Sequence, residues 1–561
     1  MLNFIIGRNN SGKTEKIRAL IAERASENKK CILIVPEQFS FESERSILEK
    51  IGAQKMLNVD ILSFTRLAFV INEQYGKALN KTIDDGTRKV LMSLSLEALS
   101  GKLEYFKRFS SKPALLSNLL TFVTELKQCA VTPDEIAEIS GKTGNKSLGK
   151  KLSELSLIAA SYDALVSRSF FDDENLLTIA ADMISETDFF DGKAVYFDAF
   201  CGFTKQERNC IKSILPKAEN VFISLCTDRD LSREGVSVFE NVNSEFSHLK
   251  ECAAEQNVGV SSPEILNVKE DGRSPELVYL EKYLCGEESE PYKEECDNIV
   301  VCAAGNRADE ADFVACEIKK LLRCNPTLRC RNIAVIERTA GTYDKELSES
   351  FKKYGVPMFE DKRRPIGIQP VMVFVKCLLA LCAEGFSTES FMRLLKTGLT
   401  ALSGDEISEL ENYAFLWNID GSKWRRDFTE NPDGLGFDVT EKSQEKLIRL
   451  NDIRKRSVLP VLAFKKDFEE ADGEKKSRLI YEFLIKNGVT ERLREKIEYL
   501  VSSGDTVLCE EQDTVWATLM DMLGKMASAI GETVITAKRY SELFNILLSA
   551  VTLGSLPQEL D

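Results

Sequence analysis

The sequence predicts an α/β fold that begins with a nucleotide-binding strand, loop and helix. Three observations lead to this class: an apolar strand at residues 2–6, a glycine-rich loop at residues 7–14 that runs into a helix, and a second apolar strand at residues 31–35. Strands that are apolar on both faces and joined by a helix are typical of parallel sheets covered by helices. The N-terminal part is therefore predicted to contain a βαβ unit.

The glycine-rich loop is a complete P-loop of the form G-x-x-x-x-G-K-T. In such loops the backbone N–H groups wrap the phosphates of a nucleotide, the lysine contacts the β and γ oxygens, and the threonine hydroxyl binds Mg²⁺. An ordinary glycine-rich turn is the alternative, but few such turns fall between a strand and a helix. ATP and Mg²⁺ are therefore the expected cofactors. The predicted nucleotide-binding residues are Gly7, Arg8, Asn9, Asn10, Ser11, Gly12, Lys13 and Thr14.

The sheet is predicted to continue on both sides of a long helical stretch. A third strand is expected at residues 57–62, and helices follow from about residue 83 to residue 186. Apolar residues recur there at spacings of three and four, which indicates amphipathic helices. Apolar strands resume at residues 193–198 and 220–225. This pattern predicts a helical insertion within an α/β domain.

A second α/β unit is predicted after an acidic segment whose best linker candidate is residues 286–291. Beyond residue 371 the pattern is almost wholly helical. The expected elements of the second unit are strands at residues 298–302 and 332–336 and helices at residues 308–323 and 347–354.

Asp198 ends the strand at residues 193–198 and is, with Thr14, the predicted magnesium ligand, partly through water. The next residue, Ala199, occupies the position where nucleotide hydrolases carry a glutamate that polarises the attacking water. A methyl group cannot act as a general base. The alternative role for Asp198 is to cap the following helix, for which Thr204 is a better candidate. We expect a site that binds ATP·Mg²⁺ and hydrolyses ATP slowly or not at all.

Charge alone does not decide whether the chain binds nucleic acid. The net charge of −15 excludes a uniformly basic surface, but a local basic channel can coexist with an acidic exterior. Basic groups at residues 362–364, 423–426 and 454–456 are candidate phosphate contacts, and Trp424 is a candidate platform for an unpaired base. Arg338 is a candidate contact to a γ-phosphate across a domain cleft. A solvated surface is the alternative for each group.

Eight motifs are spread along the chain, and together they resemble the AddB family. They are Gly-Arg-x-x-Ser-Gly-Lys-Thr at residues 7–14, Val35-Pro36-Glu37-Gln38 with Phe41-Glu42, Ser63-Phe64-Thr65-Arg66-Leu67, Asp198-x-Phe200-x-Gly202-Phe203-Thr204, Ile333-Ala334-Val335-Ile336, Tyr354-Gly355-Val356-Pro357-x-Phe359-x-Asp361, Lys396-Thr397-Gly398-Leu399 and Leu410-Glu411-Asn412-Tyr413. AddB proteins are the B subunits of bacterial AddAB helicase–nucleases, and the RexB proteins are more distant relatives. One departure is Gln369-Pro370, where relatives commonly have His-Pro.

The resemblance implies a superfamily-1 helicase-like body with two P-loop-type RecA-like domains, each carrying a large helical insertion. It implies a first RecA-like domain at residues 1–285 with its insertion at about 80–190, a linker at 286–297, the start of the second domain at 298–385 and a helical insertion at 386–561. The chain is expected to end before the second domain is complete and before the family's nuclease domain. The 4Fe–4S cluster of the family is expected only there, because none of the fifteen cysteines matches its ligands.

The resemblance also implies partners. In this family AddA drives unwinding, whereas the helicase-like half of AddB is degenerate as a motor and is implicated in recognising a Chi-type sequence. It implies a heterodimer with AddA that processes double-strand DNA ends for recombinational repair and contacts single-stranded and end-containing double-stranded DNA. The candidate DNA contacts are Arg66, Arg363, Arg364, Trp424, Arg425 and Arg426.

Two other functions stay open from the sequence. One is an active DNA-stimulated ATPase, which Ala199 and the lack of an adenine-reading glutamine before the first strand oppose. The other is a nucleotide-regulated interaction protein without DNA contact. No stretch approaches the ~18 consecutive apolar residues of a membrane span, and the N-terminus has no signal-type segment. A cytoplasmic protein without a membrane partner is therefore predicted.

Overall fold

The computed structural model describes residues 1–554 apart from 77–82, 108–111, 170–172, 229–237, 268–272, 284–289, 360–362 and 505. The chain folds into two compact units. The first combines Met1–Val268 with Pro365–Val551, and the second contains Lys269–Arg364 and the residues from Thr552 onward. Residues 286–289 of the predicted linker lie outside the described residues.

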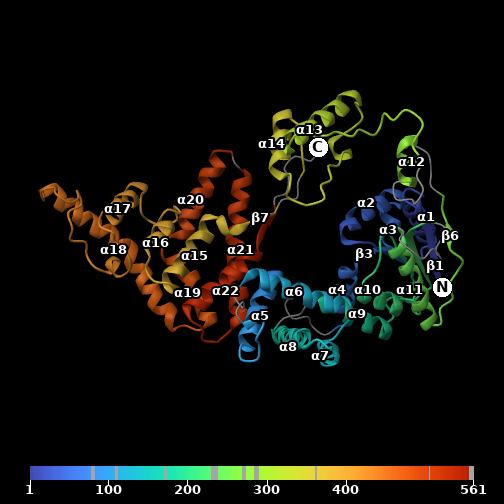
Figure 1. Ribbon diagram of the computed structural model, residues 1–561, viewed down its shortest axis with the longest axis horizontal. Coiled ribbons are helices and arrows are strands. Elements are labelled where there is room, and N and C mark those ends of the chain that lie inside the picture. The colour runs from blue at the N-terminus through green and yellow to red at the C-terminus, as the bar shows by residue number, and fades with distance from the viewer. Residues whose placement is uncertain are drawn as a thin grey trace. The chain divides into compact units, whose positions relative to one another are not determined.

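Six parallel strands form the sheet of the first unit, in the order β3-β2-β4-β5-β1-β6. Figure 1 labels β1, β3 and β6 of this sheet. Strands β2 and β4 are wholly buried and β1 is nearly so, as their apolar sequences predict. The predicted α/β class and the five predicted strands of this part are confirmed, whereas the short edge strand β6 has no apolar pattern that would indicate it. The strands are β1 (Leu2–Gly7), β2 (Cys31–Ile34), β3 (Val59–Leu62), β4 (Ala194–Phe197), β5 (Asn220–Cys226) and β6 (Glu264–Ile265).

Apolar helix faces cover both sides of this sheet. On one side α1 (Lys13–Ser26) buries Ile17, Ile21 and Ala25. On the other side four helices share one apolar cluster with the strands. Since both faces are covered, the carboxyl edge of the parallel strands is where a ligand can approach. The four helices are α4 (Phe64–Tyr75), α9 (Asp173–Glu186), α10 (Lys205–Ile214) and α11 (Glu240–Glu255), and η1 (Glu37–Phe39), α2 (Ser40–Ile51) and α3 (Ala53–Met56) connect β2 to β3.

The stretch between β3 and β4 is helical, as predicted. The α7 helix begins with a capping box, in which Thr132 and Glu135 satisfy each other's backbone N–H groups. The buried Glu154 carboxylate accepts backbone N–H groups of residues 104–106 and so fixes the turn after α5. Besides α4 and α9, the helices here are α5 (Asp85–Ala98), α6 (Pro113–Gln128), α7 (Pro133–Lys142) and α8 (Lys146–Ser169).

The part of the first unit that follows residue 365 is a second helical region, also as predicted. Within the described residues, no helix is both long and apolar enough to cross a bilayer. The elements are η4 (Ile366–Ile368), α15 (Pro370–Ala383), α16 (Thr388–Leu395), α17 (Gly404–Leu416), η5 (Gly421–Arg425), α18 (Glu441–Glu470), α19 (Gly473–Lys486), α20 (Val489–Ser502), α21 (Thr506–Ile530) and α22 (Ala537–Ala550).

Helix α5 packs directly on this second helical region. The Lys525 ammonium lies 2.7 Å from the Asp84 carboxylate, and Arg539 pairs with Glu97 at 2.9 Å. Burial raises the pKa of Asp84, but hydrogen bonds from Lys525 and Thr87 outweigh it and hold that pKa below its usual value. Two segments more than four hundred residues apart in sequence are thus joined by charge as well as by apolar contact.

Replacing Lys525 with methionine is expected to destabilise the first unit by about 1 kcal/mol at neutral pH, a value reduced because the pair is partly exposed. A depressed carboxyl pKa contributes stability that is present above the unfolded-state pKa and is lost as pH falls through the folded-state pKa. The difference between parent and variant should therefore shrink in acid. Urea unfolding at several pH values measures it, with the exposed Lys538→Met on α22 as the control; a difference that stays constant down to acid pH would contradict the pairing.

The second unit contains helices and extended segments, and two predictions fail there. Residues 298–302 and 332–336 do not form strands. They run without sheet partners among the described residues, and Val301 and Ile336 are 93% and 91% exposed. An apolar run specifies a strand only if a neighbour supplies its hydrogen bonds. The elements are α12 (Pro275–Tyr283), α13 (Arg307–Cys324), η3 (Cys330–Asn332), α14 (Asp344–Tyr354) and β7 (Arg363–Pro365), which pairs with β8 (Thr552–Gly554).

Candidate nucleotide-binding site

The P-loop joins the carboxyl end of β1 to the first turn of α1. Gly12 is the residue before the helix and has φ of 88°, a conformation that a side chain would strain. Lys13 begins the helix, and its Nζ donates hydrogen bonds of 2.8 Å to the carbonyls of Gly7 and Arg8. The ammonium group is therefore held against the loop, where the oxygens of a phosphate would compete for it.

Gly7 and Ser11 make the loop compact. A Cβ added at Gly7 would lie 2.3 Å from Ser11 Oγ and 2.8 Å from Ser11 Cβ, so only glycine fits. The Ser11 hydroxyl is buried and has no hydrogen-bond partner among the described residues. A buried hydroxyl without a partner costs free energy, and in this loop a phosphate oxygen would supply the partner. The loop therefore fits a nucleotide phosphate chain.

Asp198 follows β4 at the same edge of the sheet as the P-loop. Strand β5 lies between β4 and β1, and all three are parallel, so their carboxyl ends share one edge. The Asp198 side chain is 5% exposed, and the Ser224 hydroxyl on β5 donates to its Oδ1. Thr204, not Asp198, caps α10 through a capping box with Glu207. The alternative role of Asp198 as a helix cap is therefore excluded, and its role as a magnesium ligand stays a prediction.

Ala199 lies directly after this carboxylate. Its backbone adopts φ of 65°, which is uncommon for a residue other than glycine, asparagine or aspartate. The side chain is exposed and offers no polar atom. Ala199 therefore offers no group that could act as a general base, and slow or absent hydrolysis of ATP stays a prediction.

Comparison with known proteins relates the whole chain to one family. Residues 4–281 match the family model described as "ADDB, N-terminal". The chain is 29%, 29% and 28% identical to the B subunits of the ATP-dependent helicase/deoxyribonucleases of Acetivibrio thermocellus, Clostridium acetobutylicum and Clostridium botulinum. These alignments cover 100% of this chain and 50%, 49% and 50% of the relatives. The chain belongs to the AddB family. It corresponds to the N-terminal portion of AddB and spans about half the length of the curated relatives it matches.

Arg338, the candidate γ-phosphate contact of this AddB-family chain, is exposed at the end of the extended segment 333–338 in the second unit. It lines a cavity of about 370 Å³ with residues of α13 and α14. The neighbouring Glu337 carboxylate accepts the N–H groups of Gly341 and Tyr343, so it is committed to the local turn. The role of Arg338 at a nucleotide stays a prediction.

Four of the predicted DNA contacts are available at the surface. Arg66 is exposed in the first turn of α4, where its backbone N–H bonds to the Ser63 hydroxyl. Arg364 is exposed in β7, and Arg425 and Arg426 are exposed at the end of η5. Arg363 begins β7, but its side chain lies outside the described residues. Contact between these arginines and DNA stays a prediction.

The prediction that Trp424 stacks on a base is wrong. The residue is 0% exposed, and its indole N–H donates to the Thr388 hydroxyl at 2.9 Å. Phe391 and Phe428 pack on its ring, with centroids 4.9 and 5.9 Å away. A tryptophan beside three cations in the sequence favours a surface position, but the apolar neighbours that bury this one come from distant segments.

Sequence reasoning missed Ser224, which the structure brings to the site, and three exposed phenylalanines on the segments that follow β2 and β3. Ser224 holds Asp198, and nothing in the sequence indicates that these two positions are adjacent. Phe39, Phe41 and Phe69 are exposed, although large aromatic side chains usually help to build a core. Two of the family motifs include or adjoin these phenylalanines, which is the signal that could have drawn attention to them.

Proposed function

We propose that this chain is the ATP-binding and DNA-binding, helicase-like part of an AddB-type subunit. In this proposal the subunit pairs with AddA to process double-strand DNA ends for recombinational repair. The observation that carries it is a complete P-loop whose neighbouring carboxylate, Asp198, is followed by an alanine. The relatives, which are named as B subunits of ATP-dependent helicase/deoxyribonucleases, support the assignment to such a complex.

The nucleotide would be held by groups of the P-loop and by the carboxylate that follows β4. The loop N–H groups and the Lys13 ammonium would bind the phosphates, and Thr14 and Asp198 would hold Mg²⁺. The magnesium ion supplies positive charge that neutralises the phosphate oxygens. Ala199 cannot take a proton from water, so the bound nucleotide would persist as a structural ligand instead of driving movement.

Single-stranded DNA would pass over the carboxyl edge of the sheet. Strands β2 and β3 are paired in parallel, with Ile34 opposite Leu62, so the segments that follow them emerge together. One segment exposes Phe39 and Phe41, and the other exposes Arg66 and Phe69. Aromatic rings and a cation on segments that follow neighbouring strands match the way single strands are bound, through stacked bases and paired phosphates. Recognition of a Chi-type sequence would take place on such a surface.

Nucleotide binding and ATP turnover, measured with and without single-stranded DNA, test this proposal. We expect saturable binding of ATP in the presence of Mg²⁺ and a turnover rate close to that of the buffer blank. Single-stranded DNA should not raise it. DNA-stimulated turnover would mean that another residue replaces the missing glutamate, and the chain would then be an active motor.

A further inference from the structure

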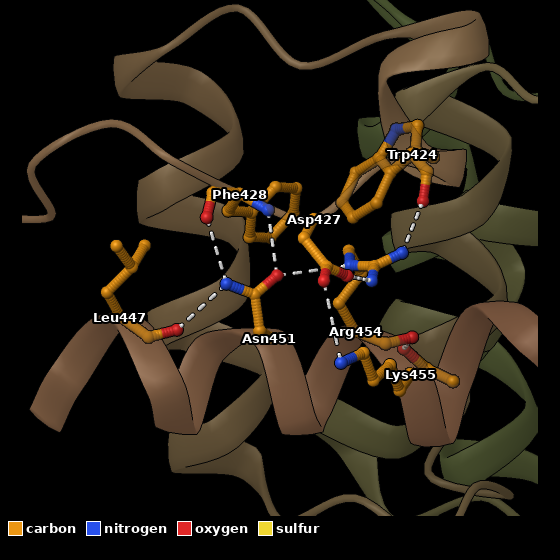
Figure 2. A network of polar contacts seen from close by, with 8 residues as sticks. Trp424, Asp427, Phe428, Leu447, Asn451, Arg454 and Lys455 are labelled. Carbon is orange, nitrogen blue, oxygen red and sulfur yellow. Dashed lines mark hydrogen bonds and ion pairs between the residues drawn. The ribbon is translucent and has the colours of Figure 1, made fainter. Parts of the chain in front are cut away.

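Residues 421–428, here called the arginine loop, are fixed to α18 by Arg454 (Figure 2). The Arg454 side chain is 2% exposed; its Nη1 donates to the Trp424 carbonyl at 3.0 Å, and its Nη2 pairs with the Asp427 carboxylate. Its guanidinium also lies 5.7 Å from the centre of the Phe428 ring. A buried cation is costly unless it is paired and hydrogen-bonded, so Arg454 depends on these loop partners.

Asn451, one turn earlier on α18, holds the other end of the loop. Its Oδ1 accepts the Phe428 N–H at 2.7 Å, and its Nδ2 donates to the Phe428 carbonyl at 3.0 Å and to the Leu447 carbonyl at 3.2 Å. On the other side of the two arginines, the Trp424 side chain is buried. The backbone is therefore anchored on both sides of Arg425 and Arg426, and the residues between the anchors are held in one arrangement before any ligand binds.

The acidic side chain of the arginine loop has ion-pair partners, whereas its two exposed arginines have none in the part of the chain that the structure describes. Asp427 is engaged by Arg454 and by Lys455, whose Nζ lies 3.6 Å from Asp427 Oδ2. Arg425 and Arg426 are exposed, and within the described residues neither guanidinium has a hydrogen bond or an ion pair. An unengaged carboxylate one or two residues away would attract both cations. Because two other cations occupy that carboxylate, the positive charge of Arg425 and Arg426 stays available.

We propose that Arg425 and Arg426 form a phosphate-contact site for single-stranded DNA and that Arg454 is its positioning residue. The inference rests on the proposed DNA-binding function and extends it to the second helical region. Guanidinium groups present several donors in a fixed fork that matches phosphate oxygens, which favours arginine at such a site. Arg454 touches no ligand: it holds the loop and keeps the Asp427 carboxylate away from the two arginines.

The test is the affinity of this chain for a fluorescently labelled oligothymidine over a range of salt concentrations. Arg425→Ala/Arg426→Ala should weaken binding and reduce the slope of log affinity against log salt by about 1.4, the value for two lost phosphate contacts on a single strand. Arg454→Met should weaken binding to a similar degree, because Asp427 then keeps only Lys455 as a partner and can pair with the arginines. Adding Asp427→Asn to Arg454→Met should restore most of the affinity and of the slope.

This rescue separates a charge effect from simple unfolding. Arg454→Met/Asp427→Asn also lacks the Arg454 side chain, so a loss of affinity caused by unfolding would persist in it. Arg449→Met is the matched control, because Arg449 lies on the same helix outside the candidate phosphate contacts, pairs with Glu409 and should leave the affinity unchanged. If the parent binds and Arg425→Ala/Arg426→Ala binds with the same affinity and the same salt slope, this inference alone is overturned. Failure of the parent to bind any single strand would overturn the proposed DNA-binding function itself.

Discussion

Replacing Lys13 with alanine is expected to remove most of the affinity for ATP. The Lys13 ammonium is held by the carbonyls of Gly7 and Arg8, both 2.8 Å away, at the place where the β and γ phosphates would lie. A charge-assisted hydrogen bond to phosphate contributes about 1.5–3 kcal/mol, so we expect the dissociation constant to rise about 10- to 150-fold. Titration calorimetry with a slowly hydrolysed ATP analogue and Mg²⁺ measures it.

Lys16→Ala is the matched control for this experiment. Lys16 lies on the same helix about one turn further on, where it forms a 2.7 Å ion pair with Glu264. Its removal should leave the affinity within about twofold, because exposed ion pairs contribute little. If Lys13→Ala and Lys16→Ala both bind ATP as tightly as the parent, the glycine loop is an ordinary turn and ATP binds elsewhere on the chain.

The sheet of the first unit is predictable because its signals are local. A strand that is apolar on every residue, followed by glycines and then by a helix, allows few structures other than βαβ. The same reasoning places Asp198 at a strand end and Thr204 at a helix start, and the structure has both. The strand order is not local, so the sequence does not show that Ser224 lies beside Asp198.

Where prediction failed, the deciding contacts come from distant parts of the chain. Residues 298–302 and 332–336 have apolar strand patterns, but a pattern does not provide the neighbouring strand that would pair with them. From the sequence, Arg454, Lys455 and Arg456 form one basic group of candidate phosphate contacts. The structure separates them, because Arg454 is buried under the arginine loop while the other two pair with acidic side chains on the outside.

Trp424→Ala is expected to be among the most destabilising single changes in the second helical region. Its ring fills a space between Phe386, Phe391 and Phe428, with centroids 6.3, 4.9 and 5.9 Å away. Removing a fully buried tryptophan ring costs about 3–5 kcal/mol through lost burial and the cavity left behind. The change also removes the indole donor from the Thr388 hydroxyl and loosens the segment that carries Arg425.

Urea unfolding followed by far-ultraviolet circular dichroism measures this cost without relying on tryptophan emission. Arg425→Ala is the neighbouring surface control and should change stability by less than about 0.5 kcal/mol. The two variants should therefore differ in kind: Trp424→Ala lowers the unfolding midpoint, whereas Arg425→Ala lowers only the affinity for single-stranded DNA. A Trp424→Ala protein as stable as the parent but deficient in DNA binding would place the indole at the surface, as the basic residues around it in the sequence predict, and would contradict its burial.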